Sequence, residues 1–387
     1  MIKRLPIIVF ILALILVAPP DSAAAQDIPP SGSEPFNGDL LCQPDVYLEQ
    51  PQDCLPYGPS STLTDLAQRG ITYPLPPLPS LQPPSELAYI PYQYIKLVYH
   101  GPVPVYGSLE DAMGDNVRRY VPNGFRYISY NDRRERPEGV FYLAQSGEWL
   151  EGSYVSRVSP QNTQGFLFQS TPENAFGWLL DVVETQSTPG LGGQTTGHKL
   201  NRLDVVTIFD SQWIEDNEWF LIGVNEWVEK KFIAPVIPNP TPPEGVTNGR
   251  WIELNLYNQT LMVYDKGEMI FATITSSGIN PFFTRPGLFQ IYQKLEKETM
   301  STGNINDYYY LEDVPYTMYF DEARALHGAY WHSQFGYTRS HGCVNLSIAD
   351  SRWLFDWAQA GEWVYVWDPT GRTPTDPAFY EQYGGGP

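Results

Sequence analysis

A repeated pattern of alternating apolar and polar residues limits what the middle of this chain can fold into. Residues 141–160 read FYLAQSGEWLEGSYVSRVSP, and residues 219–238 read WFLIGVNEWVEKKFIAPVIP. At a constant offset of 78 positions, Trp149 matches Trp227 and the aromatic and acidic residues around them match as well. Short alternating runs split by Gly and Asn are typical of β-strands. The repetition therefore predicts two copies of one small β-barrel-like unit.

Proline-rich segments mark the borders of these units. One ends in YPLPPLPSLQPPS and is predicted to be an extended spacer, and the other is APVIPNPTPPEG at 234–245. A chain of 387 residues with 36 Pro and 32 Gly suits several domains with mainly β structure. The expected organisation is a signal peptide (1–25), a spacer (26–85), two β-barrel-like repeats (86–160 and 161–238), a linker (239–247), a C-terminal domain (248–369) and a tail (370–387).

The N-terminus predicts export. Lys3 and Arg4 precede an apolar run over 7–17, which is too short to span a bilayer comfortably. Pro19 and Pro20 end the run, and small residues that suit cleavage follow. We therefore expect a location on the outer side of the cytoplasmic membrane, in the cell envelope. An uncleaved membrane anchor is the alternative.

Export changes the interpretation of the three cysteines. Cys42 and Cys54 are close together in a Pro-rich stretch, and an oxidising compartment would let them form a disulfide. Cys343 is left without a partner, so it is either buried or used in chemistry. The formal net charge of −20 argues against nucleic acid as a partner, because contacts to phosphate need a clustered positive surface.

The C-terminal block reads as mainly β with one or two helices. Two alternating runs flank Asp265-Lys266-Gly267, which predicts a hairpin. Further strands are expected in 284–295, 316–320 and 362–368. A helix is predicted after Ser347, which can cap it, and before Gly361.

Three of the five histidines lie close to Cys343 in LHGAYWHSQFGYTRSHGCVNLS. Nucleophilic catalysis by Cys needs a base to take the thiol proton, and backbone N–H groups to stabilise the oxyanion. His341 is very near Cys343 in sequence, so His327, on a separate segment, is the better candidate base. The N–H groups of Gly342 and Cys343 are candidate oxyanion donors.

Two other interpretations of this cluster stay open. His327, His332, His341 and Cys343 are all legitimate zinc ligands, but their spacing does not match that of structural zinc sites. The other interpretation is a buried thiol with histidines on the surface. We expect no metal and no cofactor.

The sequence LHG, followed after a gap by SHGCVN, resembles the signature of the L,D-transpeptidases, the YkuD-type catalytic domain of bacterial cell-wall enzymes. IELNLYNQTLMVY resembles their opening strand pair, and TRPGLF their Thr-Pro-x-Gly turn, except that Arg285 precedes Pro286. The resemblance covers 248–369 and implies a β-sandwich with one or two helices. The two middle repeats resemble bacterial Src-homology-3-like barrels through their Trp and Gly placement.

The resemblance also implies residue roles. Cys343 would be the nucleophile and His327 the base, with the Gly328 carbonyl orienting the imidazole. His341 and Gly342 would shape the pocket, and Ser340 would support the loop. Asn345 stands where many members have Arg and has no charge to offer a substrate carboxylate, so Arg339 is a second candidate for that contact.

The implied activity is peptidoglycan cross-linking. Cys343 would attack a tetrapeptide stem, release D-Ala and pass the acyl group to an amine of another stem, giving a 3-3 cross-link. Attack by water would make an L,D-carboxypeptidase, and attack by a protein amine would anchor that protein to the wall. The expected partners are stem peptides, with wall glycan on the repeats as a further expectation. The non-catalytic alternative is a cell-wall binding protein.

Overall fold

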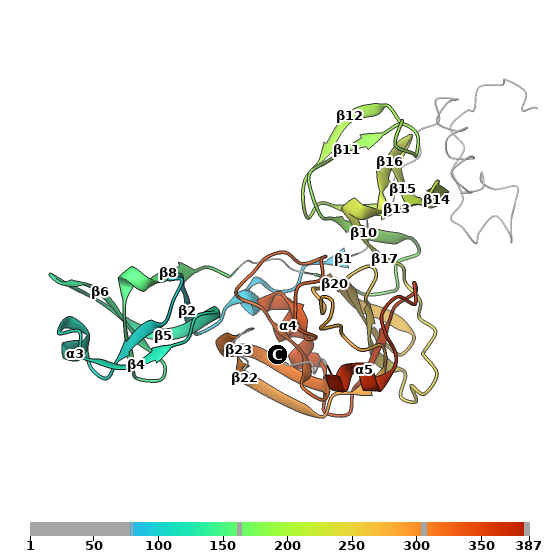
Figure 1. Cartoon of the computed structure of the whole chain (residues 1–387). Helices are drawn as coiled ribbons and strands as arrows, with labels where there is room; N and C mark the ends of the chain where they lie inside the picture. Colours follow the sequence, from blue (N-terminus) through green and yellow to red (C-terminus); the bar gives the residue numbers. More distant parts are fainter. Residues whose placement is uncertain (1–77, 79, 161–164, 303–307, 383–387) are drawn as a thin grey trace, which may run out of the picture. The chain divides into compact units, whose positions relative to one another are not determined.

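The computed structural model describes residues 78, 80–160, 165–302 and 308–382, all of which belong to one compact unit. The predicted signal peptide, Cys42, Cys54 and most of the predicted spacer lie outside the described residues. No helix in the described ranges is long and apolar enough to cross a membrane. The fold is mainly β, as predicted (Figure 1).

The first repeat, defined here as residues 93–158, contains seven strands and a short helix. They are β2 (Gln93–Leu97), β3 (Val103–Tyr106), α3 (Leu109–Met113), β4 (Val117–Val121), β5 (Phe125–Arg136), β6 (Gly139–Ala144), β7 (Trp149–Glu151) and β8 (Val155–Val158). Its own apolar core includes Ile95, Val105, Ile128 and Leu150.

The second repeat, residues 175–236, contains eight strands. They are β10 (Ala175–Leu179), β11 (Val183–Gln186), β12 (Thr195–Leu200), β13 (Val205–Ile208), β14 (Asp210–Ile214), β15 (Asn217–Gly223), β16 (Glu226–Glu229) and β17 (Ile233–Val236). A separate core, which includes Leu179, Phe220, Val228 and Ile233, holds them together.

The offset of 78 in the sequence is kept in the strand pairing. Phe141 lies opposite Glu151 between β6 and β7, and Trp219 lies opposite Glu229 between β15 and β16. A short 3-10 turn follows each second strand, at Gly152–Tyr154 and Lys230–Phe232. The two segments are therefore copies of one β-unit in structure as well as in sequence. Their resemblance to Src-homology-3-like barrels stays a prediction.

The C-terminal domain is a sandwich of two sheets. Its elements are β18 (Arg250–Asn255), β19 (Thr260–Asp265), β20 (Glu268–Ile274), β21 (Gly287–Gln290), β22 (Gln293–Ser301), β23 (Tyr309–Asp321), β24 (Arg324–Gly328), β25 (Val344–Leu346), α4 (Ile348–Trp357), β26 (Trp363–Trp367) and α5 (Pro377–Gln382). One sheet runs β20-β19-β18-β26-β21, and the facing one contains β22, β23, β24 and β25.

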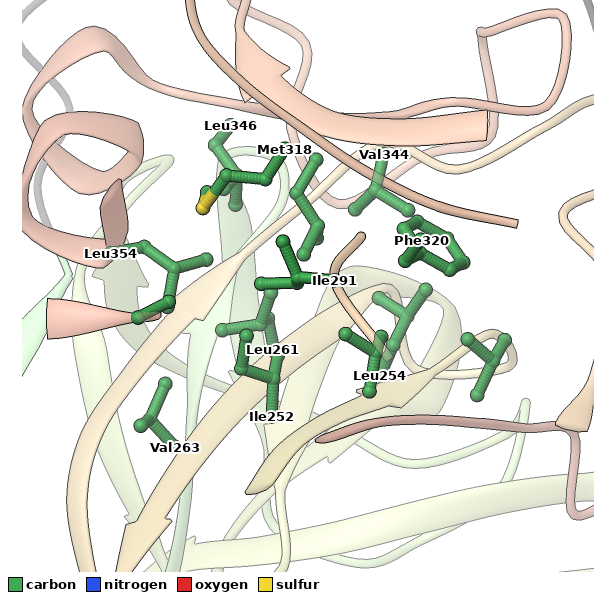
Figure 2. Close-up of a cluster of buried hydrophobic side chains, with 14 of the residues drawn as sticks. Ile252, Leu254, Leu261, Val263, Ile291, Met318, Phe320, Val344, Leu346 and Leu354 are labelled. Atoms are coloured by element: carbon green, nitrogen blue, oxygen red, sulfur yellow. The ribbon is translucent and has the colours of Figure 1, made fainter. Parts of the chain in front are cut away.

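The core between these sheets is apolar and fully buried. Figure 2 shows Ile252, Leu254, Leu261 and Val263 from the first sheet facing residues of the second, with Leu354 from α4 beside them. Burial of side chains of this size contributes about 1.5–3 kcal/mol each, so this cluster fixes the sandwich.

The local signals in the C-terminal block are mostly confirmed. A two-residue turn, Lys266-Gly267, joins β19 to β20, and both residues have positive φ as such a turn requires. Ser347 caps α4 by accepting a hydrogen bond from the Asp350 N–H at 3.1 Å. The helix ends at Trp357, before Gly361, because Ala358 already has an extended backbone.

Two short strands join the first sheet from segments expected to lie outside this domain. β9 (Phe166–Phe168) pairs with β20, and β1 (Ser80–Leu81) pairs with β9. The pairing covers the open edge of β20, whose backbone groups would otherwise lack partners. Part of the expected spacer and of the expected second repeat thus belongs to the C-terminal sheet.

Candidate active site

Strand alternation places His327 and Asn345 on the face opposite the core. Leu326 and Val344 lie side by side in the parallel pair β24–β25, and both point into the buried cluster. The next residues along the two strands, His327 and Asn345, are also paired. Since successive side chains of a strand point to opposite sides, these two line a pocket on the other face.

Cys343 immediately precedes β25, and its side chain lines the same pocket. It is the free cysteine of the described residues and is buried. Its thiol donates a weak hydrogen bond to the Ala323 carbonyl at 3.7 Å and accepts one from the Ala325 N–H at 3.4 Å. Burial raises the pKa of the thiol to about 11, although the Ala325 N–H opposes the shift. At neutral pH the resting group is a thiol.

His327 is held in one tautomer by the backbone. Its Nδ1 lies 3.2 Å from the Gly328 carbonyl oxygen, so Nδ1–H donates there and Nε2 keeps a free lone pair. Burial lowers the pKa of His327 to about 4. The imidazole is therefore neutral at physiological pH and is suited to accept a proton.

The loop before Cys343 is fixed by internal hydrogen bonds, and this corrects one expectation. The Ser340 hydroxyl donates to the Cys343 carbonyl and accepts the Gly342 N–H at 3.1 Å. The Gly342 N–H is therefore engaged and is not a free oxyanion donor, whereas no described backbone carbonyl accepts from the Cys343 N–H. Gly342 has φ of 121°, and Thr284 donates to its carbonyl at 2.9 Å. Glycine is needed at this turn for its backbone conformation.

His341 and Arg339 occupy the rim of the pocket. The His341 ring packs against Phe282 and Tyr309, with centroids 4.7 and 5.5 Å apart. Arg339 is exposed and lines the pocket. The position of His341 fits a role in shaping the pocket.

Cys343 opens into a pocket of about 370 Å³ that is built from more than one part of the chain. The C-terminal domain contributes Met300, Tyr309, Leu311, His327, Trp331, His332, Arg339, Ser340, His341, Cys343 and Asn345. The first repeat contributes Lys96, Phe125 and Tyr127. Sequence reasoning missed these three residues, because they lie more than two hundred positions before Cys343 and no local pattern marks them.

Backbone pairing and buried polar groups hold the first repeat at the pocket. β5 pairs in parallel with β23, and Phe125 lies opposite Tyr309. The Ser129 hydroxyl donates to Asp313 at 2.5 Å, and the Ser129 N–H donates to Glu312 at 3.1 Å. Burial raises the pKa of Glu312, since the charged carboxylate is poorly solvated there.

Arg285, which departs from the Thr-Pro-x-Gly turn of the family, has an acidic partner in the structure. Its guanidinium forms a salt bridge with Asp321, which also pairs with the buried Arg324. Tyr380, in the expected tail, lies over the Arg324 guanidinium at 4.7 Å. The positive charge of Arg324 also opposes the upward pKa shift of Cys343.

The histidines and Cys343 line one pocket, but their arrangement does not match a metal site. Among the described residues, no group of three or more His, Cys, Asp or Glu side chains is placed to hold a metal ion. His332 instead contacts the Asn345 side-chain amide, with 2.9 Å between His332 Nε2 and the amide.

Comparisons with known proteins find a family match for the C-terminal domain. Residues 249–366 match the sequence profile of the YkuD family, the L,D-transpeptidase catalytic domain. No curated protein matches the chain. The matched range contains both His327 and Cys343.

Several solved structures of such enzymes are similar to this chain. The NMR structure of the catalytic domain from the E. faecium L,D-transpeptidase is 28% identical, with a TM-score of 0.29, and covers 32% of this chain and 100% of that chain. The same values hold for that domain acylated by ertapenem. The L,D-transpeptidase from Mycobacterium smegmatis is 20% identical, with a TM-score of 0.30, and covers 42% and 90% of the two chains.

Proposed function

We propose that this protein is an exported L,D-transpeptidase that forms 3-3 peptidoglycan cross-links through a thioester on Cys343. The observation that carries the proposal is the placement of Cys343 and His327 in one pocket of an L,D-transpeptidase catalytic domain. The thiol and the neutral imidazole are complementary, because one has a proton to give and the other has a free lone pair at Nε2.

The first half of the proposed reaction is acylation. As Sγ attacks the carbonyl carbon between the third residue of the stem and D-Ala, its proton passes to Nε2 of His327. The C–N bond then breaks, and the imidazolium gives the proton to the leaving amine of D-Ala. A thioester to Cys343 remains. The Cys343 N–H is the oxyanion donor, since the Gly342 N–H is engaged by Ser340.

The second half regenerates the thiol. A side-chain amine of another stem attacks the thioester carbonyl, His327 takes a proton from that amine, and the thiolate leaves and is reprotonated. An amide bond forms and the thioester bond breaks, so neither a metal nor a redox cofactor is needed for the balance of the step.

The proposal is tested with the chain lacking residues 1–25 and a disaccharide-tetrapeptide as donor. We expect free D-Ala and a product whose mass equals two donors minus one D-Ala. Cys343→Ala should give neither, and Cys343→Ser should be far slower because the hydroxyl is a weaker nucleophile. Equal D-Ala release from wild type and Cys343→Ala would reject the enzyme, and no release from either would favour a non-catalytic wall-binding protein.

Product masses also separate the possible acceptors. A tripeptide stem with no dimer would mean that water is the acceptor and that the protein is an L,D-carboxypeptidase. Transfer only to added protein amines would make it a wall-anchoring transpeptidase. Ertapenem offers a simpler probe of the nucleophile, since its strained β-lactam carbonyl is an electrophile for a thiolate; one adduct per wild-type chain and none on Cys343→Ala is expected.

A further inference from the structure

The catalytic pocket has a charge opposite to that of the chain. The protein has 44 acidic and 24 basic residues, with a formal net charge of −20. Among the described residues that line the pocket, however, Lys96 and Arg339 are basic and none is acidic. A positive pocket on an acidic protein attracts and retains an anionic ligand. In a stem peptide, the anionic groups are carboxylates.

A second observation concerns the contact between His332 and Asn345. As placed, the amide nitrogen of Asn345 faces His332 Nε2 at 2.9 Å. The amide oxygen, Oδ1, is then buried and has no hydrogen-bond partner among the described residues. The two ends of an amide have nearly the same shape, so the surrounding hydrogen bonds decide which end faces the ring.

The other nitrogen of His332 settles the orientation of this amide. The Gln334 N–H donates to His332 Nδ1 at 3.2 Å, so Nδ1 must have a free lone pair. Burial, with Arg339 and His327 nearby, lowers the pKa of His332 to about 3, and the neutral ring has a single proton. That proton must then be on Nε2, which needs an acceptor. The acceptor that Asn345 can offer is Oδ1, not its NH₂ group.

With Oδ1 toward His332, the buried acceptor gains its partner and the NH₂ group of Asn345 takes the unpartnered position. We propose that His332 is a positioning residue that makes Asn345 a hydrogen-bond donor, and that this donor, Arg339 and Lys96 together bind a carboxylate of the stem peptide. The inference rests on the proposed function for the identity of the substrate. It also gives the first repeat a direct part in substrate binding, through Lys96.

Lys96 is well placed for this role within the first repeat. It lies opposite Tyr127 in the β2–β5 pair, and its ammonium is 5.8 Å from the centre of the Tyr127 ring. The Tyr127 ring interacts with the Lys96 side chain, and Lys96 stays exposed at the pocket. An exposed cation of this kind should change ligand affinity only several-fold.

The orientation is tested without any turnover. Protein labelled with ¹⁵N-histidine is studied by long-range ¹H–¹⁵N NMR, with His332→Gln used to assign the signals. We expect His332 to have its proton on Nε2 and a free lone pair on Nδ1 at neutral pH. A proton on Nδ1 would overturn the orientation of Asn345.

The carboxylate is tested by calorimetric binding to the Cys343→Ala protein, which keeps the donor intact. Three donors are compared: the tetrapeptide, its C-terminal amide, and a form with the internal carboxylates amidated. We expect one amidated form to bind about tenfold more weakly, and it identifies which carboxylate is held. Equal affinity for all three donors would overturn the proposal.

Variants then assign the donors. Lys96→Gln should weaken binding of the free carboxylate about three- to fivefold and leave the sensitive amide unchanged, whereas Lys199→Gln in the second repeat should change neither. His332→Ala should lose the preference for the carboxylate, and His332→Gln should partly restore it, because Gln can donate to Oδ1 of Asn345. A loss that is equal for free and amidated donors would overturn these roles.

The proposed function can fail separately from this inference. Selective binding of the carboxylate to Cys343→Ala, with no D-Ala released by the wild-type chain, would keep the carboxylate site and reject the transpeptidase.

Discussion

The two repeats share one strand register, but they join the catalytic domain by different means. The second repeat is joined by an apolar cluster in which Phe176, Trp178 and Val236 pack with Trp251 and Tyr264 of the catalytic sheet. The first repeat is joined by strand pairing and by hydrogen bonds from Ser129 to buried carboxyl groups, in addition to a cluster in which Tyr94 stacks on Tyr330. Only the first repeat lines the pocket of Cys343. The same β-unit therefore serves as a structural support in one copy and as a wall of the site in the other.

The interiors of the two repeats differ as well. In the first repeat, Leu109 and Ala112 of α3 pack on the cluster around Phe141 and Trp149. In the second repeat, Trp219 and Trp227 line an open cavity of about 230 Å³. Tyr106 lies opposite Trp149 in the first repeat, and Gln186 lies opposite Trp227 in the second. The side-chain oxygen of Gln186, Oε1, is buried and has no hydrogen-bond partner among the described residues. The space beside the two matching Trp residues is therefore filled differently in the two repeats.

The largest expected effect is on stability, at the apolar cluster that joins the second repeat to the catalytic sheet. Trp178→Ala should lower the free energy of unfolding by about 3–5 kcal/mol, because it opens a cavity in the cluster shared with the catalytic sheet. Urea unfolding measures the change. Trp213→Ala is the control, since Trp213 is 63% exposed, and it should stay within about 0.5 kcal/mol of wild type. Equal values for the two variants would remove the proposed joint.

The next effect concerns activity at the first repeat. Phe125→Ala should lower kcat/KM for D-Ala release about three- to tenfold, because an apolar contact of the pocket is lost. Its melting temperature should change little, since Phe125 is 42% exposed. Tyr120→Ala in the same repeat lies outside the lining residues and should keep full activity. Unchanged kcat/KM for Phe125→Ala would separate the first repeat from catalysis.

A smaller effect is the pH dependence of stability, which should differ between the contacts that hold the first repeat and those that hold the second. The pKa of Glu312 is raised in the folded protein, mainly by burial. Its stabilising contribution is thus complete below the unfolded-state pKa of about 4.3, and it is lost as pH rises through the raised folded-state pKa. Glu312→Gln should flatten this part of the curve of unfolding free energy against pH, whereas Trp178→Ala should shift the whole curve without changing its slope. An unchanged slope in Glu312→Gln would contradict the contribution of buried Glu312 to the contact between the first repeat and the catalytic domain.

The smallest effect tests the open interior of the second repeat. Gln186→Met should raise the free energy of unfolding by about 1 kcal/mol, because it removes a buried oxygen that has no partner. Gln194→Met, at an exposed position, should give no gain. Destabilisation by Gln186→Met would show that the Gln186 amide is in use, for example by a ligand of the cavity.

Local signals predicted that His327 and Cys343 belong together, and both line one pocket. Such signals depend on residues that are close together in the sequence. Examples are the spacing of His327 and Cys343, the Lys266-Gly267 turn and the Ser347 cap. The part played by Lys96 and Phe125 depends on β5 pairing with β23, which is a contact between distant segments. No periodicity in either segment indicates that pairing.

Side-chain hydrogen bonds also changed the roles expected for two residues of the site. Gly342 was expected to stabilise an oxyanion with its N–H, but the hydroxyl of Ser340 reaches that group first. His332 was considered only as a zinc ligand, whereas its Nε2 faces Asn345. Both outcomes depend on the shape of a loop, and a loop shape is set by packing that the sequence does not display.

The central claim is that Cys343 forms a covalent acyl-enzyme. Intact mass of the chain lacking residues 1–25, taken within seconds of mixing with the tetrapeptide donor and followed by peptide mapping, tests it most directly. We predict an added mass equal to the donor minus D-Ala, localised to Cys343, that disappears when an amine acceptor is added. D-Ala release without any such adduct, or an adduct on another residue that persists in Cys343→Ala, would contradict the account.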